Sequence, residues 1–417
     1  MINFKENKII KFSIPIVMII LSFFARIIDS NIYSVVLVSL WLFFINMLLK
    51  KKINRKIYIF INIYILINII LILLATLQAK EWGFSLGILH GGVKGIEYND
   101  AYNYYNNIID NYNVNLTDYL KNFIVNIKSD NYIYNVFILY NLVISKIFGL
   151  SIEVLLISKL IFTVLSIYLI VFICDILGIK RKLLAISFFS FYPGYLYINI
   201  NFLRDNFIVF FVIFIIYFYL RLYKSKVLNK KEIILILVGF LFLIVLRLYS
   251  AVILGGCLFL FSKTKNKKQL RIKIIMAIVA ILIVNQLSII FGYGILGFNY
   301  INSYVNNVGY INAIAQTIIR LLIGFRVIGI ALSSGLISNF LVMISPIYIS
   351  LINIILFILI LRKKVILNKL NMKILSFYFI FAFLNGLILV LRDQIIVERI
   401  YAMWIWMIAL VISTYEE

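Results

Sequence analysis

The sequence GIEYNDAYNYY, residues 95–105, lies at the centre of residues 78–131, the one long polar interruption in an otherwise hydrophobic chain. Apolar runs precede and follow this interruption, so we expect it to be a loop that joins membrane-spanning helices. The loop sets the carboxylates Glu97 and Asp100 among tyrosine and asparagine side chains. A carboxylate can act on hydroxyl groups as an acid or a base, and flat aromatic faces suit sugar rings. The pattern therefore favours a sugar-handling site, with an ordinary solvated loop as the alternative.

Composition defines the fold class. Hydrophobic residues make up 64% of the 417 positions, only 13% are charged, and the mean hydropathy is +1.07. A soluble domain is closer to half apolar and a quarter charged. Apolar runs of about 17–25 residues, each long enough to cross a bilayer as a helix, recur along the whole chain. The sequence thus predicts an all-α, polytopic integral membrane protein with about 12 transmembrane helices.

The charge distribution gives an orientation. The formal net charge is +24 at pH 7, but most of the 40 Lys and Arg residues fall in short clusters between apolar runs, which does not indicate nucleic-acid binding. Cytoplasmic loops carry such an excess of positive charge. The abundance of Ile, Asn and Lys is typical of an AT-rich bacterial gene. We therefore expect a multi-pass protein of the bacterial cytoplasmic (inner) membrane, with both termini in the cytoplasm and residues 78–131 outside.

The predicted spanning helices lie at residues 9–28, 33–49, 57–77, 152–177, 183–198, 204–221, 233–261 (in two halves), 274–291, 340–361, 374–391 and 400–412. Residues 233–261 have basic flanks on both sides, which predicts two short helices that meet outside near Arg247. Pro193 and Gly194 predict a kink in the fifth helix.

Residues 1–417 are expected to form a single transmembrane domain with two large outer segments. The first, residues 78–131, includes an amphipathic surface helix at 116–127 and is followed by an interfacial or re-entrant helix that extends to residue 150. The second outer segment covers residues 292–339. Helices at the outer membrane surface would thus lie beside the spanning bundle.

Arginines gather at the predicted outer face. Charged groups at the ends of membrane helices are functional candidates by default, and the planar guanidinium suits bidentate recognition of phosphate. The arginines concerned are Arg204, Arg247, Arg320, Arg326, Arg392 and Arg399. Structural roles stay open as alternatives to phosphate binding. Asp205 could cap a helix, Arg247 could extend to lipid headgroups, and Arg392 could join an ion-pair network.

Short motifs carry a resemblance to known enzymes. They are Asp100-Ala101-Tyr102 in the acidic first loop, Phe148-Gly149-Leu150-Ser151, and Leu203-Arg204-Asp205 at the head of a helix. Over roughly residues 97–222, the chain resembles bacterial polysaccharide-assembly membrane enzymes, both the Wzy-type O-antigen or capsule polymerases and the C-type (GT-C) glycosyltransferases. The resemblance implies a GT-C-like fold and a role in lipopolysaccharide or capsule biosynthesis.

These families use sugars linked to polyprenyl phosphate or undecaprenyl pyrophosphate at the outer face. By resemblance, Asp100 is the general base that activates the acceptor hydroxyl, with Glu97 and Asp205 as further catalytic carboxylates. The arginines would hold the pyrophosphate leaving group, and Tyr102 and Tyr105 are candidates for sugar binding. Expected partners are the polyprenyl-linked oligosaccharide or sugar, membrane lipid, and a chain-length regulator and flippase of the same pathway. No particular cofactor is implied, and a divalent metal stays open.

Three functions stay open at this point. The preferred one is a repeat-unit polymerase that joins lipid-linked oligosaccharides. The second is a GT-C transferase that adds a single sugar from a polyprenyl-phosphate donor. The third is a lipid-linked oligosaccharide flippase, which the large outer loop and the one-sided charges disfavour.

Overall fold

The computed structural model describes residues 31–50, 53–82, 88–89, 100–125, 136–225, 230–262, 271, 275–276, 309–323, 336–391 and 398–415. Within these ranges the regular structure is helical and contains no strand. The helices are α2 (Ile32–Leu49), α3 (Arg55–Trp82), α4 (Asp100–Asn111), α5 (Leu116–Val125), α6 (Val136–Phe148), α7 (Ile152–Leu177), α8 (Lys182–Ser190), α9 (Pro193–Ile200), α10 (Asp205–Ser225), α11 (Lys230–Phe261), α14 (Tyr310–Ile323), α15 (Leu336–Leu361), α16 (Lys369–Leu391), α17 (Glu398–Tyr401) and α18 (Ile405–Ile412).

The described part of the chain confirms a polytopic helical membrane protein. Seven of its helices are long and apolar enough to span a bilayer, namely α2, α3, α7, α10, α11, α15 and α16, and the bent pair α8–α9 makes eight if it forms one span. The predicted helix at 9–28, and nearly all of the one at 274–291, lie outside the described residues. A total of about twelve spans stays a prediction.

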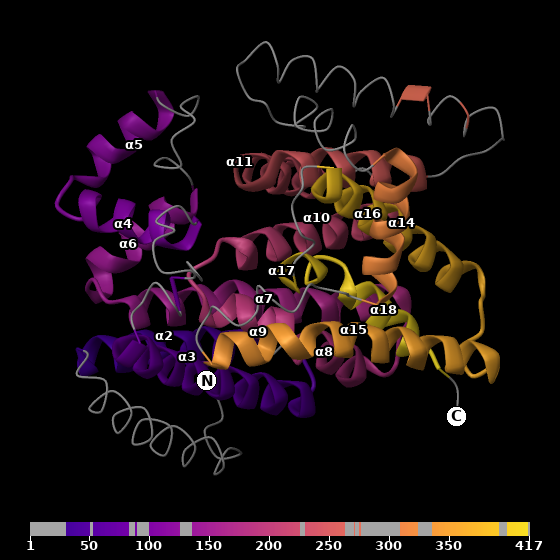
Figure 1. The fold of residues 1–417 in the computed structure, drawn as a ribbon, viewed down its shortest axis with the longest axis horizontal. Helices are drawn as coiled ribbons and strands as arrows, with labels where there is room; N and C mark the ends of the chain where they lie inside the picture. Colours follow the sequence, from indigo (N-terminus) through magenta and orange to yellow (C-terminus); the bar gives the residue numbers. More distant parts are fainter. Residues whose placement is uncertain are drawn as a thin grey trace.

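α7 is the central helix of the bundle. Its N-terminus is capped by Ser151, whose hydroxyl accepts a hydrogen bond from the Val154 amide at 3.3 Å, and it ends at Gly178 in the left-handed conformation with φ of 75°. Such a glycine is a common helix C-terminus because it carries no Cβ. α7 packs against α10, α2 and α3 (Figure 1) and is buried along most of its length.

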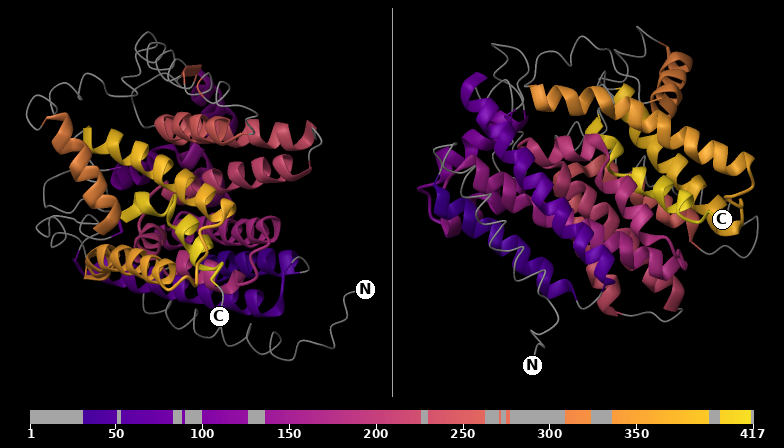
Figure 2. Two further views of the ribbon diagram at one scale, coloured as in Figure 1. Left: turned by 90° about the vertical axis from the view of Figure 1, so that its right-hand side faces the viewer. Right: turned by 90° about the horizontal axis from the view of Figure 1, so that it is seen from below.

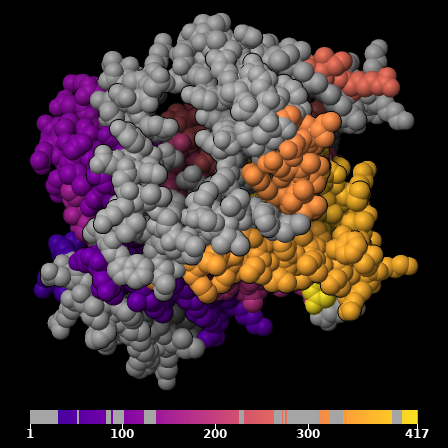
Figure 3. Space-filling view, viewed as in Figure 1, coloured from indigo at the N-terminus to yellow at the C-terminus, as the bar shows by residue number. Residues whose placement is uncertain are grey.

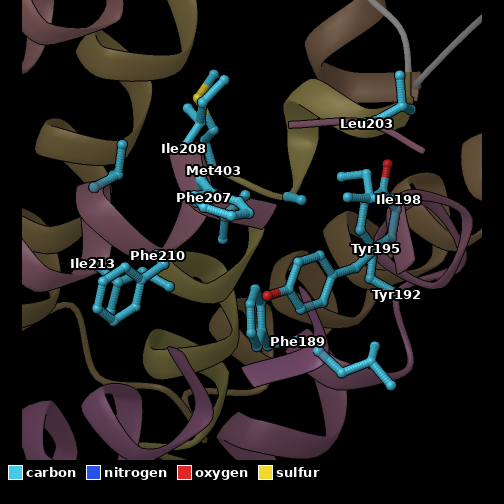
Figure 4. Close-up of a cluster of buried hydrophobic side chains, with 14 of the residues drawn as sticks. Phe189, Tyr192, Tyr195, Ile198, Leu203, Phe207, Ile208, Phe210, Ile213 and Met403 are labelled. Carbon is cyan, nitrogen blue, oxygen red and sulfur yellow. The ribbon is translucent and has the colours of Figure 1, made fainter. Parts of the chain in front are cut away.

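The expected kink at Pro193 is confirmed. α8 ends at Ser190, α9 begins at Pro193, and the two axes differ by 57°. Proline lacks an amide hydrogen and fits the first turn of a helix, so the chain restarts its helix there. All eight residues of α9 are buried. Figure 4 shows the aromatic side chains packed around this bend, with Phe189 and Tyr195 near each other.

The expected break at Arg247 is also confirmed, because its φ of −161° and ψ of 85° are not helical. The two halves of α11 fold back on each other, since a Cβ added to Gly255 would lie 3.7 Å from the Phe240 ring. Both ends of α11 lie beside the end of α10: Glu232 forms an ion pair with Arg221 at 3.0 Å, and the Leu258 carbonyl accepts a hydrogen bond from Tyr219. α11 is therefore a hairpin that turns at Arg247, packed along α10 (Figures 1 and 2).

The expected helices of the first loop are present where the structure describes them. α5 covers most of the predicted amphipathic helix. α6 has 13 residues, about 20 Å of helix, which is shorter than a bilayer core of roughly 30 Å. This length agrees with a non-spanning helix after the loop. Figure 1 shows α4, α5 and α6 grouped at one end of the bundle, with the C-terminus toward the other end.

The C-terminal helix differs from the expected continuous segment at 400–412. A turn at residues 402–404 separates α17 from α18. The turn carries Trp404, which is fully buried and meets the Phe381 ring of α16 edge-on at 6.1 Å. The turn thus places this large side chain in the interior of the bundle.

The predicted orientation can be tested by labelling single cysteines. The two natural cysteines, Cys174 and Cys257, are buried, so background reaction should be low. We expect Asn111→Cys, at the end of α4, to react with a membrane-impermeant maleimide in intact cells, and Lys364→Cys to react only after permeabilisation. The reverse pattern would contradict the orientation.

Candidate functional site

The candidate site is built at the junction of α9 and α10. Asp205 is the first residue of α10, where a negative charge interacts favourably with the helix dipole. Arg204 precedes it and is half-buried. The junction is tied to the first loop because the Phe202 amide donates a hydrogen bond to the Ile88 carbonyl at 3.0 Å.

Asp205 and Arg247 form a buried ion pair. The Arg247 Nη2 atom donates to the Asp205 carboxylate at 2.8 Å, and their side chains are only 4% (Asp205) and 10% (Arg247) exposed. Charges in such surroundings need a partner, because leaving one of them unpaired is costly. Arg247 Nη1, also buried, has no hydrogen-bond partner among the residues that the structure describes. The pair therefore orients a guanidinium group that keeps a donor edge for a further acceptor.

A buried lysine, Lys159, supports the junction from α7. Lys159 is completely buried, and its ammonium group donates hydrogen bonds to the carbonyls of Ile198, at 2.7 Å, and Asn201. The last carbonyls of a helix have no partner within the helix, so they need a donor from elsewhere. Lys159 thus fixes the end of α9 and, through it, the start of α10.

A network of amides extends from this junction into the bundle. Asn199 accepts hydrogen bonds from Thr163, at 2.9 Å, and from Asn206, at 2.6 Å. It donates in turn to the Asn68 amide oxygen at 2.7 Å and to the Tyr64 hydroxyl at 3.1 Å. The network therefore links α3, α7, α9 and α10 by polar contacts between buried side chains, as a non-aqueous interior requires.

α4 packs against the same junction. The Arg204 guanidinium lies 5.7 Å from the centre of the Tyr104 ring, and the rings of Tyr105 and Phe202 meet edge-on at 5.9 Å. Burial raises the pKa of the Tyr105 hydroxyl, and the nearby Glu153 carboxylate raises it further, so Tyr105 stays a neutral hydrogen-bond donor. The loop helix that starts at Asp100 is thus docked beside the Asp205–Arg247 pair.

Figure 3 shows the α4–α5 segment at one side of this face of the molecule. α11 turns at Arg247 beside Asp205, the first residue of α10. The arrangement combines a guanidinium that keeps a spare donor edge with aromatic rings. Such a set suits an anionic ligand with a bulky, ring-containing part.

The structure brings together four of the predicted site residues: Arg204, Asp205, Arg247 and Tyr105. Tyr102 is half-buried on the same helix, α4. For Asp100 and Arg399 only the backbone is described, and Glu97, Arg326 and Arg392 lie outside the described residues.

Arg320 is not part of the Asp205–Arg247 pair. It lies on α14, which packs mainly against α16 and α15, and it donates a hydrogen bond to Gln316 at 3.2 Å on its own helix. The end of α14 also contacts the second half of α15, because the Leu322 carbonyl accepts a hydrogen bond from the Asn353 side chain. α14 therefore lies along the side of the bundle, as Figure 1 shows.

Sequence reasoning missed Lys159, Asn199 and Asn206. A signal was present for Lys159, because it is a lone cation inside the apolar run 152–177, and ionisable residues inside membrane helices are functional candidates. The asparagines gave no such signal, since asparagine is abundant throughout the chain.

Among the described residues, no group of three or more His, Cys, Asp and Glu side chains could hold a metal ion. Comparisons of the chain with protein-family models, with curated proteins and with solved structures found no match.

The ion pair can be tested by its effect on stability. We expect Asp205→Ala to destabilise the protein by about 3–5 kcal/mol, because it leaves Arg247 charged and buried without its partner. The double variant Asp205→Ala, Arg247→Leu should recover part of this loss. Thermal unfolding in detergent measures both.

Asp118→Ala is the matched control, because it breaks an exposed ion pair with Lys121 at 3.8 Å. Exposed pairs contribute about 0–1 kcal/mol, so this variant should unfold close to the wild type. Equal shifts for Asp118→Ala and Asp205→Ala would contradict a structural role for the buried pair.

Proposed function

We propose that this protein is a membrane glycosyltransferase that acts at the outer face of the cytoplasmic membrane on sugars linked to polyprenyl phosphate or pyrophosphate. Its preferred form is an O-antigen or capsular polysaccharide repeat-unit polymerase. The observation that carries the proposal is the Asp205–Arg247 pair, buried beside the docked helix α4. The resemblance of the loop and of Leu203-Arg204-Asp205 to such enzymes supports the same activity.

The proposed reaction joins an acceptor sugar to a lipid-linked donor. The acceptor hydroxyl oxygen attacks the anomeric carbon of the donor, while the bond from that carbon to the phosphate oxygen breaks. The base takes the hydroxyl proton, and the electron pair leaves with the polyprenyl pyrophosphate. The chemistry therefore needs a base on the acceptor side and cations on the leaving-group side.

The arginines fit the leaving-group side. Arg247 is held by Asp205 through Nη2, which leaves Nη1 for a phosphate oxygen. Arg204, adjacent to Asp205 and over the Tyr104 ring, would be a second guanidinium. Donors oriented before the substrate arrives stabilise developing negative charge without reorganisation.

Asp100 is the proposed base. Asp205 is bound to Arg247, so an orienting role suits it better than proton transfer. Asp100 begins α4, the helix whose Tyr105 ring meets Phe202 of the junction. A base on this helix would be carried by an element docked beside the arginines, and Tyr105 would donate a hydrogen bond to the sugar.

We expect Asp100→Asn to insert normally and to make little or no extended glycan. The amide keeps the shape of the carboxylate but cannot take a proton, and loss of a general base typically lowers the rate by about 10²–10⁴-fold. Asp110→Asn and Asp118→Asn, at exposed positions of the same loop, serve as controls and should be much milder. Normal glycan from Asp100→Asn together with its loss in Glu97→Gln would move the base to Glu97.

We expect Arg204→Lys and Arg247→Lys to impair activity while protein levels are maintained. Lysine keeps the charge but loses the planar fork that binds two oxygen atoms. Transfer can be measured in membranes supplied with lipid-linked oligosaccharide. Full activity of both lysine variants would indicate that charge alone suffices and would contradict bidentate phosphate binding.

Product length in the same assay separates the alternatives. A polymerase gives a ladder of repeat lengths, and a single-sugar transferase gives one added residue. A flippase gives no new glycosidic bond at all, an outcome that would overturn the proposed enzyme activity.

A further inference from the structure

The bundle end opposite the Asp205–Arg247 pair is rich in cations. Lys182 pairs with Asp175 there, and the Arg181 guanidinium lies 3.6 Å from the centre of the Tyr415 ring. Arg221 pairs with Glu232 at 3.0 Å. In the proposed topology this end faces the cytoplasm, and the cytoplasmic leaflet carries anionic lipids.

A cavity of about 480 Å³ lies at this end, between α7, α10, α11, α16 and α18. Its wall is apolar for most of its extent and includes Ile173, Leu258, Phe377, Trp406 and Leu410. Ligand cavities have volumes of about 300–1,000 Å³, so this one has room for a hydrocarbon chain. An apolar wall selects a hydrocarbon over a polar metabolite.

Two lysines are the charged members of the cavity lining in the described part of the chain. They are Lys224, near the end of α10, and Lys373, in the first turns of α16, and both are exposed. The Lys224 ammonium donates to the Ile176 carbonyl at 3.3 Å, and the Lys373 ammonium lies 5.9 Å from the centre of the Tyr223 ring. Each lysine therefore lies beside the cavity and keeps further hydrogens for an anion.

We propose that this cavity binds one acyl chain of an anionic phospholipid, whose phosphate lies between Lys224 and Lys373. Two cations beside an apolar cavity match a ligand with one anionic group on a hydrocarbon chain. A zwitterionic phospholipid would gain less electrostatic attraction, because its own cationic group would lie close to the lysines. The proposal does not depend on the enzyme activity, because the cavity lies at the opposite end of the bundle from Arg247.

Bound lipid would act on packing. The wall residues of α7 and α10 meet those of α16 and α18 across the cavity, and α10 also carries Asp205 at its other end. A filled cavity restores dispersion contacts that an empty one lacks. An anionic lipid would therefore hold these four helices together from the basic end.

Trp406 in the wall is a reporter for the bound chain. The full-length protein is placed in phosphatidylcholine vesicles that contain a fixed fraction of either phosphatidylglycerol or phosphatidylcholine with dibrominated acyl chains. Bromine quenches tryptophan fluorescence on contact. The signal is the quenching that the wild-type protein shows and the Trp406→Phe variant lacks. We expect the brominated phosphatidylglycerol to quench this signal with a relative affinity roughly tenfold higher than that of the brominated phosphatidylcholine.

The double variant Lys224→Gln, Lys373→Gln should lose this preference. Lys56→Gln, Lys364→Gln is the matched control, because it removes two exposed lysines from the same end without touching the cavity lining, and it should keep the preference. Equal quenching by both lipids in the wild type would overturn the proposal, as would an equal loss in both double variants. Abolition of the preference by added glycerol phosphate would show that a free phosphate suffices and would overturn the acyl-chain part.

Discussion

The buried ion pair of Asp205 and Arg247, with the polar contacts around it, explains how the helices at the junction of α9 and α10 are arranged. A membrane core offers no water to unsatisfied polar groups, and buried polar groups from several helices find partners at this junction. Asp205 neutralises Arg247, while Lys159 binds the carbonyl groups at the end of α9. Four helices, α7, α9, α10 and α11, are thereby fixed relative to one another around residues 198–205.

The same contacts explain why a functional site would form there. Replacement of a buried ion pair by apolar residues is often neutral or stabilising, so the pair is not needed for stability as such. What it provides is an oriented guanidinium with a spare edge beside the docked helix α4. The opposite end carries exposed lysines around an apolar cavity and suits lipid contact instead. The two ends of the bundle thus carry different kinds of side chains, and α7 and α10 run from one end to the other.

Local features of the sequence predicted much of this fold. The proline predicted the bend before α9 because it acts on the adjacent helical turn. The basic flanks of residues 233–261 predicted the turn at Arg247 because both flanks must stay on the cytoplasmic side. The partner of Arg247 could not be predicted, since Asp205 lies 42 positions away and only tertiary packing selects it. Lys159 was overlooked although a lone cation in an apolar helix is a signal, and its partners are carbonyls that no sequence pattern marks.

The central claim is that a lipid-linked phosphate binds at the junction of α9 and α10. The most direct measurement uses a polyprenyl pyrophosphate with a photoreactive group next to its phosphates, cross-linked to the full-length protein in membranes and mapped by peptide mass spectrometry. The account predicts cross-links to peptides that contain residues 201–205 and Arg247. Cross-links confined to peptides around Lys224 and Lys373 would contradict it, because they would place the phosphate at the opposite end of the bundle.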